Sequence, residues 1–289
     1  MHYSGAVYRP PSEAHSLIVQ CTLGCSHNKC AFCIMYKEKQ FSINPIEQVL
    51  DDLAEARTYY PHIERIFLAD GDALVLPMDY LLSVLDYISG HFPECERVSA
   101  YASAKALRKK TDEELETLRR RGLAMVYVGL ESGNEDLLLR YDKGVTAEEI
   151  IRQSLRAKAA GMTLSVTAIN GMGGKEKSEI HALDTAAALS RIRADYIAML
   201  TLRVYSGTPL HDWIERGELT MLGPQELAME NRLILEHLDS DGSVFRSNHA
   251  SNYLPLKGTL NRDRGALIQQ IDRALAGEVR FRRAVELGL

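Results

Sequence analysis

The stretch SLIVQCTLGCSHNKCAFC, from Ser16 to Cys33, joins a short apolar run to a loop that carries four cysteines. Its first part, residues 16–21, is almost continuously apolar, which is typical of a strand buried on both faces. Beyond the cysteine loop, residues 45–60 carry apolar side chains at the period of a helix. The stretch therefore predicts a strand, a loop suited to chemistry and a helix in succession.

The same alternation of strand and helix recurs along the chain. Further strands are predicted at residues 63–69, 97–103, 124–130, 163–169 and 196–204, and further helices at residues 79–92, 112–121, 147–160 and 179–191. Buried strands that alternate with helices indicate a parallel sheet with helices outside, joined by right-handed crossovers. A complete eight-unit barrel needs about 250 residues. We therefore expect an α/β fold, a partial (β/α)6 TIM-like barrel with a mainly helical C-terminal extension.

The chain is expected to form three consecutive segments. These are a lead-in at residues 1–15, the barrel at residues 16–212 and an extension at residues 213–289 that packs on the barrel. No linker rich in Pro, Gly or Ser separates the extension, so a second independent domain is not expected. Two helix starts are predicted from capping side chains, Asn44 before the helix at 45–60 and Thr146 before the helix at 147–160.

Composition narrows the class of protein. With 289 residues, 46% hydrophobic residues and a net charge of −5, the chain is neither disordered nor a small disulfide-rich protein. A mildly acidic chain is not built to coat nucleic acid. No apolar segment is long enough to cross a bilayer, and residues 1–19 lack the pattern of a secretory signal. We expect a cytoplasmic protein with neither a membrane nor a nucleic-acid partner.

The cysteines point to a metal centre. Four of the five lie in one loop, which in a reducing compartment indicates a metal site rather than disulfides. Three thiolates can hold three irons of a cubane cluster and leave the fourth iron open to another ligand. Structural zinc would instead take four closed ligands. The candidate zinc ligands are Cys21, Cys25, Cys30 and Cys33, with His27 as a substitute. The spacing favours an iron–sulfur cluster and leaves zinc open.

The loop resembles the cluster loop of radical S-adenosylmethionine (SAM) enzymes. That family commonly has Gly-Cys at the first ligand and an aromatic residue before the last, as at Cys25 and Phe32 here. The family usually spaces its cysteines C-x3-C-x2-C, whereas four residues separate Cys25 from Cys30 in this chain. The resemblance implies that Cys25, Cys30 and Cys33 hold a 4Fe-4S cluster, and that Cys21 packs at the strand end.

Further segments continue the resemblance in order along the chain. Residues 69–73 (ADGDA) resemble the family's Gly-Gly-Glu segment, and residues 167–173 (TAINGMG) its fifth-strand segment. Residues 128–133 (VGLESG), continued by 139–146, resemble the branch that includes oxygen-independent coproporphyrinogen oxidases and methylthiotransferases. Residues 206–210 (SGTPL) resemble the sixth-strand segment. Together these matches cover residues 16 to 212.

The resemblance implies a SAM site at the carboxyl ends of the strands. In the family the backbone of the segment at 69–73 receives the amino group of SAM, and the backbone at Ile169 contacts adenine. The residues expected to bind the cofactor are Phe32, Asp70, Gly71, Asp72, Ser103, Glu131, Ser132, Ile169, Gly171 and Tyr205. For Glu131, pairing with a nearby lysine or arginine is an equally good interpretation, and the glycines at 171 and 173 could simply turn the chain.

The implied reaction is reductive cleavage of SAM at a single cluster. The resulting 5′-deoxyadenosyl radical would act on an unidentified small-molecule or nucleotide-like substrate, with an electron donor such as flavodoxin or ferredoxin, in an oxygen-sensitive enzyme. Methylthiotransfer is not expected, because only Cys21 and Cys95 would remain for a second cluster. An iron–sulfur carrier or a zinc-stabilised binding module is the alternative.

An irregular polar patch at residues 247–258 is the candidate substrate contact. Its candidate side chains are Asn248, His249, Asn252 and Lys257. A hydrogen-bonded loop that closes the extension is an equally good interpretation. No side chain is assigned a catalytic role.

Overall fold

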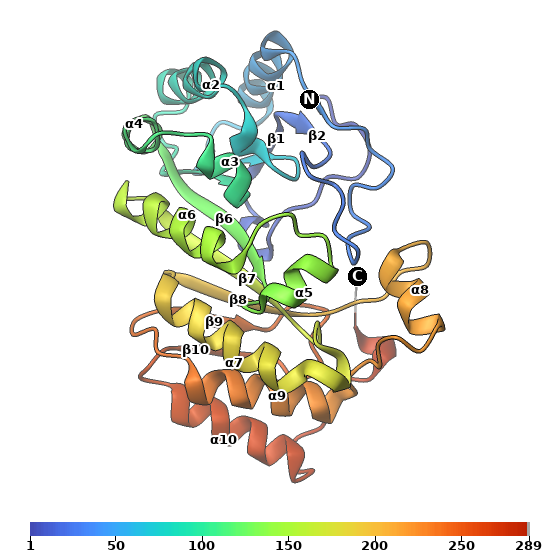
Figure 1. The fold of residues 1–289 in the computed structure, drawn as a ribbon. Helices are drawn as coiled ribbons and strands as arrows, with labels where there is room; N and C mark the ends of the chain where they lie inside the picture. The colour runs from blue at the N-terminus through green and yellow to red at the C-terminus, as the bar shows by residue number, and fades with distance from the viewer. Residues whose placement is uncertain (288–289) are drawn as a thin grey trace. The chain divides into compact units, whose positions relative to one another are not determined.

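The computed structural model describes residues 1–287 (Figure 1). The chain forms two compact units. The first unit comprises Met1–Asn28, Cys33–Val128 and Arg152–Leu164, and the second comprises Lys29–Phe32, Gly129–Ile151 and the chain from Ser165 onward. Residues 29–32 of the cysteine loop thus belong to the second unit. The predicted boundaries after residues 15 and 212 stay a prediction.

One eight-stranded sheet runs in the order β1-β4-β5-β6-β7-β8-β9-β10. Its strands are β1 (Leu17–Gln20), β4 (Arg65–Ala69), β5 (Arg97–Tyr101), β6 (Leu123–Glu131), β7 (Thr163–Asn170), β8 (Tyr196–Thr201), β9 (Val244–Ser247) and β10 (Leu256–Thr259). The pairs β1–β4, β4–β5, β5–β6, β7–β8 and β8–β9 are parallel, and β10 is antiparallel to its neighbour β9. This mostly parallel sheet confirms the predicted α/β class.

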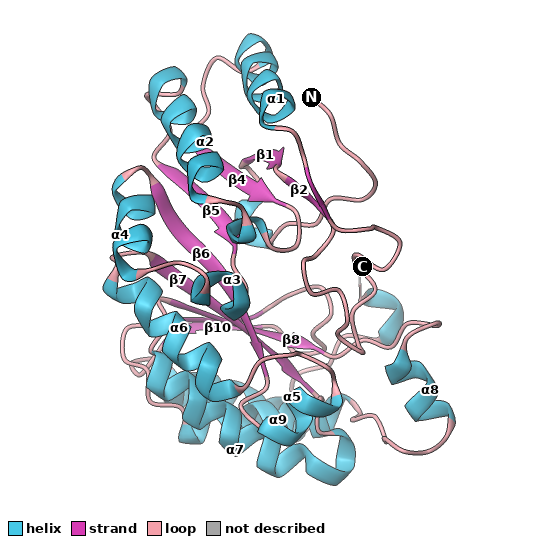
Figure 2. Cartoon of the chain, turned by 45° about the horizontal axis from the view of Figure 1, so that its top comes forward, coloured by secondary structure: helices cyan, strands magenta, loops and turns pink. Residues whose placement is uncertain are grey.

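Helices follow the strands as the sequence predicts (Figure 2). They are α1 (Ile46–Tyr59), α2 (Met78–His91), α3 (Ala104–Arg108), α4 (Asp112–Arg120), α5 (Glu135–Arg140), α6 (Ala147–Ala159), α7 (Gly174–Ile192), α8 (Pro209–Glu215), α9 (Pro224–His237) and α10 (Arg264–Leu275). Within the second unit α9 packs between α7 and α10. A small antiparallel pair, β2 (Thr22–Leu23) and β3 (Ser42–Ile43), frames the cysteine loop. Three short 3-10 helices complete the elements, at Pro11–Glu13, Ala73–Val75 and Ala284–Glu286.

Each strand and helix predicted before residue 204 is present, with its ends shifted by a few residues. Thr146 caps α6 as predicted, because its hydroxyl accepts the Glu149 N–H at 3.0 Å. The predicted cap at Asn44 is wrong. The Asn44 amide instead donates to the Gln20 carbonyl at 2.6 Å, so it serves the end of β1 and leaves the start of α1 without a side-chain cap.

The C-terminal extension is mainly helical, as predicted, and it also contains two short strands. Besides α9 and α10 it contributes β9 and β10, which continue the sheet beside β8. The irregular patch at residues 247–258 is the connection between these two strands. Among residues 1–287, no helix combines the length and the apolar character that crossing a membrane requires.

Each unit has its own apolar core. In the first unit, Phe67 packs edge to face on Tyr101 and Tyr127, with ring centroids 5.0 and 5.9 Å away. In the second unit, the buried Tyr141 packs with Ile169 and Met172. Burial of such rings and aliphatic chains stabilises each unit, and it fixes the strand ends from which the candidate site is built.

Candidate functional site

The first turn of the cysteine loop lies in the first unit and is closed by hydrogen bonds. Gly24 has a φ of +75°, which favours glycine. Its N–H donates to Asp70 Oδ2 at 3.0 Å, and its carbonyl accepts the Gly71 N–H at 3.1 Å. These two bonds join the residue before Cys25 to the loop after β4, which is the segment predicted to receive SAM.

Cys21 differs from the other loop cysteines. It is fully buried, and burial raises the pKa of its thiol to about 12, so the sulfur keeps its proton near neutral pH. A protonated, buried thiol is a poor metal ligand, in keeping with the packing role predicted for it.

The other three loop thiols have the chemistry of cluster ligands. Cys25, Cys30 and Cys33 are partly exposed and form no disulfide. Three thiols in one loop suit the three irons that a cubane presents to a protein. Within residues 1–287, however, the side chains of His, Cys, Asp and Glu nowhere form a group of three or more that could hold a metal ion. The three thiols fit a cluster by their chemistry.

The middle of the loop is anchored in the second unit. The Ala31 N–H donates to the Tyr141 carbonyl at 2.9 Å, and the Ala31 carbonyl accepts the Leu210 N–H at 3.2 Å. The Phe32 ring packs edge-on to Tyr141 with centroids 5.9 Å apart. Phe32, predicted from the motif, is thus part of the apolar core there and positions the backbone between Cys30 and Cys33.

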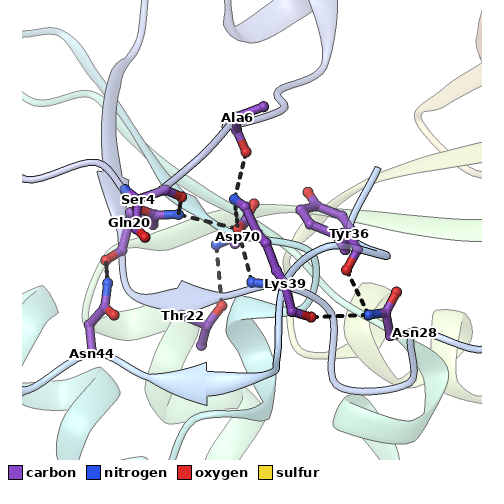
Figure 3. A network of polar contacts seen from close by, with 10 residues as sticks. Ser4, Ala6, Gln20, Thr22, Asn28, Tyr36, Lys39, Asn44 and Asp70 are labelled. Carbon is purple, nitrogen blue, oxygen red and sulfur yellow. Dashed lines mark hydrogen bonds and ion pairs between the residues drawn. The ribbon is translucent and has the colours of Figure 1, made fainter. Parts of the chain in front are cut away.

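A buried carboxylate organises the loop in the first unit (Figure 3). Asp70 has no exposed surface, and its Oδ2 accepts Lys39 Nζ at 2.7 Å and Gln20 Nε2 at 3.2 Å besides the Gly24 N–H. We call Asp70 with these three donors the Asp70 anchor. The nearby Tyr36 ring is mostly buried, and burial and the Asp70 carboxylate raise its pKa, so it remains a neutral phenol. The motif predicts Asp70, whereas sequence reasoning missed Lys39 and Gln20.

Position 71 requires a glycine, because the chain packs closely against its neighbours there. A Cβ at this position would lie 2.6 Å from a Tyr36 ring carbon and 2.9 Å from Cys25 Cβ. Only glycine lets the two segments approach this closely.

Asp72 connects the same segment to the end of β5. Its Oδ2 accepts the hydroxyls of Ser26 at 2.5 Å and Ser103 at 2.7 Å, and its Oδ1 accepts the Ser103 N–H at 2.9 Å. The structure therefore brings the predicted residues Asp72 and Ser103 together beside the cysteine loop. Ser103 also caps α3 through the Ala106 N–H at 3.0 Å.

Glu131 ends β6 in the second unit and has a cationic partner. Its Oε1 lies 2.8 Å from Lys143 Nζ, with 13% and 17% of the two side chains exposed. Its φ of +63° turns the chain, and its carboxylate folds back over Gly129, where a Cβ would lie 2.1 Å away. The pairing considered from sequence is thus present, with the lysine supplied by the segment that continues the motif.

A second buried carboxylate lies at the end of β7. Glu230, from α9, accepts the Gly171 N–H at 2.7 Å and the Ser178 hydroxyl at 2.5 Å. We call Glu230 with these two donors the Glu230 anchor. Burial raises the pKa of Glu230 to about 7. Sequence reasoning predicted Gly171 and missed Glu230, which lies 59 residues further along the chain.

A neutral histidine links the ends of β6 and β7. Burial lowers the pKa of His181 to about 4, so the ring is uncharged near neutral pH. Its Nε2 lies 3.0 Å from the Ile169 carbonyl and therefore donates, which leaves Nδ1 to accept the Ser132 hydroxyl at 2.8 Å. The predicted residues Ser132 and Ile169 are thus connected through a side chain that the sequence did not single out.

The remaining predicted residues have varied surroundings in the second unit. The Tyr205 carbonyl accepts the Thr208 hydroxyl at 2.7 Å. Asn252 is buried, and its amide donates to the Met199 carbonyl at 2.7 Å and to the Ser247 hydroxyl at 2.8 Å, as a hydrogen-bonded loop requires. Asn248 and Lys257 are exposed, and His249 is half-buried. A substrate role for residues 248–257 stays a prediction.

Comparison with known proteins identifies the family. The Radical SAM superfamily matches residues 19–187, which run from within β1 to within α7 and contain the cysteine loop. The chain belongs to the radical SAM superfamily. Its members are enzymes that use SAM and a [4Fe-4S] cluster, and the resemblance found in the sequence is confirmed.

Two curated relatives are similar to parts of the chain. The 4'-phospho-dehydrooxetanocin synthase of Priestia megaterium is 26% identical over 168 residues, which are 52% of this chain and 23% of that protein. The heme chaperone HemW of Mycobacterium tuberculosis is 25% identical over 195 residues, which are 66% of this chain and 48% of that protein. The chain thus spans less than half the length of either relative.

Solved structures show the same fold at low sequence identity. Methylornithine synthase (PylB) superposes with a TM-score of 0.57 at 12% identity, over 89% of this chain and 68% of that one. Coproporphyrinogen III oxidase (HemN) from Escherichia coli, a radical SAM enzyme, gives 0.55 at 15% identity, over 76% and 52%. The methyltransferase TsrM from Kitasatospora setae, with its [4Fe-4S] cluster, gives 0.55 at 19% identity, over 68% and 38%. These likenesses support the partial-barrel architecture.

Proposed function

We propose that this protein holds one [4Fe-4S] cluster through Cys25, Cys30 and Cys33 and cleaves SAM reductively to act on a small-molecule or nucleotide-like substrate. The observation that carries the proposal is the packing of Gly71 against Cys25, with the Gly71 N–H bonded to the Gly24 carbonyl. This packing brings the first proposed ligand next to the segment that would receive SAM.

The chain's own residues would hold and orient the two cofactors. When bound, the cluster and SAM supply a one-electron cleavage of a carbon–sulfur bond and so the 5′-deoxyadenosyl radical. Cys25, Cys30 and Cys33 would ligate iron as thiolates, and the backbone at residues 70–72 would accept the amino group. Asp72 holds Ser26 and Ser103 against this backbone. The two backbone hydrogen bonds of Ala31 fix residues 29–32 and would hold the backbone that carries Cys30.

The second unit would bind the nucleoside part of SAM. Lys143 pairs with the Glu131 carboxylate and orients it at the end of β6, where it would accept hydrogen bonds from the hydroxyl groups of a ribose. His181 and the Glu230 anchor fix the turn around Ile169 and Gly171, which the family motif assigns to adenine. The residues at 248–257 would contact the substrate. We further propose a cytoplasmic, oxygen-sensitive enzyme that receives electrons from a flavodoxin or a ferredoxin.

The test is SAM cleavage by anaerobically reconstituted protein. With iron, sulfide, dithionite and SAM, we expect a brown cluster and formation of 5′-deoxyadenosine. Cys30→Ala should abolish both, whereas Cys95→Ala, which removes a thiol outside the loop, should leave both unchanged. If a complete cluster forms but no 5′-deoxyadenosine is produced, the proposed SAM-cleaving activity is wrong. Zinc bound by four sulfur or nitrogen ligands would instead show a zinc-stabilised module.

A carrier function is the second candidate, and the similarity to the heme chaperone HemW over 66% of the chain favours it. A carrier would bind its cargo without consuming SAM. Titration of the reconstituted protein with haemin distinguishes the two functions. Stoichiometric haemin binding without 5′-deoxyadenosine supports the carrier, and 5′-deoxyadenosine without haemin binding supports the enzyme.

A further inference from the structure

We infer that Lys39 is a positioning residue for the cluster, acting through Asp70 on the Cys25 turn and on the charge beside it. The inference rests on the proposed function, because it assumes a cluster bound through Cys25. It assigns a role to a loop lysine that no motif marks.

Lys39 and Asp70 form a buried ion pair (Figure 3). The two charged groups are 2.7 Å apart, with 9% of the lysine side chain and none of the aspartate side chain exposed. Lys39 Nζ also donates to the Ala6 carbonyl at 2.6 Å and lies 5.6 Å from the centroid of the Tyr36 ring. Through these contacts Lys39 connects the N-terminal segment, the cysteine loop and the end of β4.

The pair acts directly on the turn that carries the first proposed ligand. The oxygen of Asp70 that binds Lys39 also accepts the Gly24 N–H. At Gly24 a Cβ would lie 3.2 Å from Lys39 Cβ, so the lysine stem packs on the same turn. If Lys39 is removed, the Asp70 carboxylate is left buried and unpaired, and a buried charge without a partner is strongly unfavourable. The turn before Cys25 would then lose the group that holds it.

The pair also controls the local charge. Asp70 precedes Gly71, where an added Cβ would lie 2.9 Å from Cys25 Cβ. A cluster held by three thiolates is anionic, and its reduction adds another negative charge, so nearby charges shift its potential. The Asp70 carboxylate alone would oppose reduction, and the Lys39 ammonium offsets it. Removal of the lysine and removal of the carboxylate should therefore shift the potential in opposite directions.

The experiment compares full-length wild type, Lys39→Met, Asp70→Asn, the double variant and Lys37→Met after anaerobic reconstitution. Lys37 is an exposed lysine of the same loop whose ammonium donates to the Asn28 carbonyl at 2.9 Å, and it is the matched control. The readouts are iron and sulfide per chain, the midpoint potential from a dye-mediated titration followed by electron paramagnetic resonance, and the unfolding midpoint of the cluster-free chain.

We expect Lys39→Met to lower cluster affinity by about tenfold or more and to move the potential of the remaining cluster to more negative values. Asp70→Asn should move it to more positive values, and the double variant should return close to wild type. Lys37→Met should change nothing.

Potentials that do not move in opposite directions overturn the inference, even if Lys39→Met unfolds more easily, since a purely structural role would change only stability. If Lys39→Met does not fold, Asp70→Asn tests the inference by itself. Its midpoint potential should still move to more positive values, and the absence of that shift overturns the inference. Absence of a cluster in the wild type overturns the proposed function and the inference with it. A normal wild-type cluster without these shifts overturns the inference alone.

Discussion

The two units each bury a carboxylate at the end of a strand, and they stabilise it in different ways. Asp70 in the first unit and Glu230 in the second each accept the N–H of a glycine in a turn, Gly24 and Gly171 respectively. Both carboxylates are fully or almost fully buried. Asp70 has the ammonium of Lys39 at 2.7 Å, whereas the nearest basic group to Glu230 recorded among residues 1–287 is His181 at 3.8 Å.

The difference shows two ways to offset the free-energy cost of burying a carboxylate. Since burial lowers the pKa of His181 to about 4, its ring offers no positive charge near neutral pH. Burial therefore raises the pKa of Glu230 to about 7, and the anchor gains stability by keeping a proton. Asp70 instead has the ammonium of Lys39 as its partner, so the first anchor holds its carboxylate through an ion pair. The Glu230 anchor holds its carboxyl through uncharged donors and responds to pH.

Removal of the cation should have the largest effect on stability. Breaking a buried pair by removing one partner typically costs about 3–5 kcal/mol, so Lys39→Met should destabilise the cluster-free chain by roughly that amount. Urea unfolding at neutral pH, compared with Lys37→Met, measures it. Equal stability of the two variants would show that Asp70 does not depend on its lysine.

The Glu230 anchor should instead show a pH dependence. Glu230 binds its proton with a pKa of about 7 in the folded chain against 4.5 in the reference state, so its stabilising contribution is complete below 4.5 and is lost as the pH rises to about 7. Glu230→Gln does not titrate, and its stability relative to wild type should rise across this window by on the order of 3 kcal/mol. Unfolding free energies from pH 4 to 8, with the exposed Glu215→Gln as control, test this. A pH-independent difference would mean that Glu230 is already ionised.

Loss of the close packing beside the Asp70 anchor should destabilise the chain less than loss of the Lys39 charge. Gly71→Ala places a methyl group 2.6 Å from the Tyr36 ring, and such overpacking costs about 1–3 kcal/mol. It should also push Cys25 away and reduce cluster content. Gly90→Ala in α2 is the control, because nothing lies within 4 Å of its Cβ. Thermal unfolding and iron analysis of both variants provide the measurement, and an unperturbed Gly71→Ala would disprove the close approach.

Removal of one donor from the Glu230 anchor should have the smallest effect. The Ser178 hydroxyl lowers the pKa of Glu230, so Ser178→Ala should raise that pKa further and move the stability transition to higher pH. The loss of a single hydrogen bond costs about 1 kcal/mol. Carbon-13 NMR titration of the glutamate carboxyls measures the shift, with Ser83→Ala in α2 as control. A lower pKa in Ser178→Ala would contradict the account of the anchor.

The fold was largely predictable because most of its strands lie in apolar runs that alternate with periodic helices. Leu123–Glu131 and Thr163–Asn170 are examples in which burial on both faces leaves a clear signal. The strands β9 and β10 were not predicted, because their sequences carry too little apolar pattern. β10, for example, is the four-residue segment Leu256–Thr259, which includes Lys257 and Gly258.

The site was predictable only where its residues are contiguous. The segment from Asp70 to Asp72 follows a strand and matches a motif, so its members were found. Lys39 lies 31 residues before Asp70, and Glu230 lies 59 residues after Gly171. A single lysine in a loop and a single glutamate on a helix resemble solvated surface residues, and only folding brings them to the strand ends.

The most direct test of the central claim is Mössbauer spectroscopy of the protein reconstituted anaerobically with iron-57, before and after addition of SAM. The account predicts the signature of a [4Fe-4S] cluster in which one iron site changes when SAM binds, and its loss in Cys30→Ala. A spectrum that SAM leaves unchanged, or iron that binds equally well without Cys30, would contradict it.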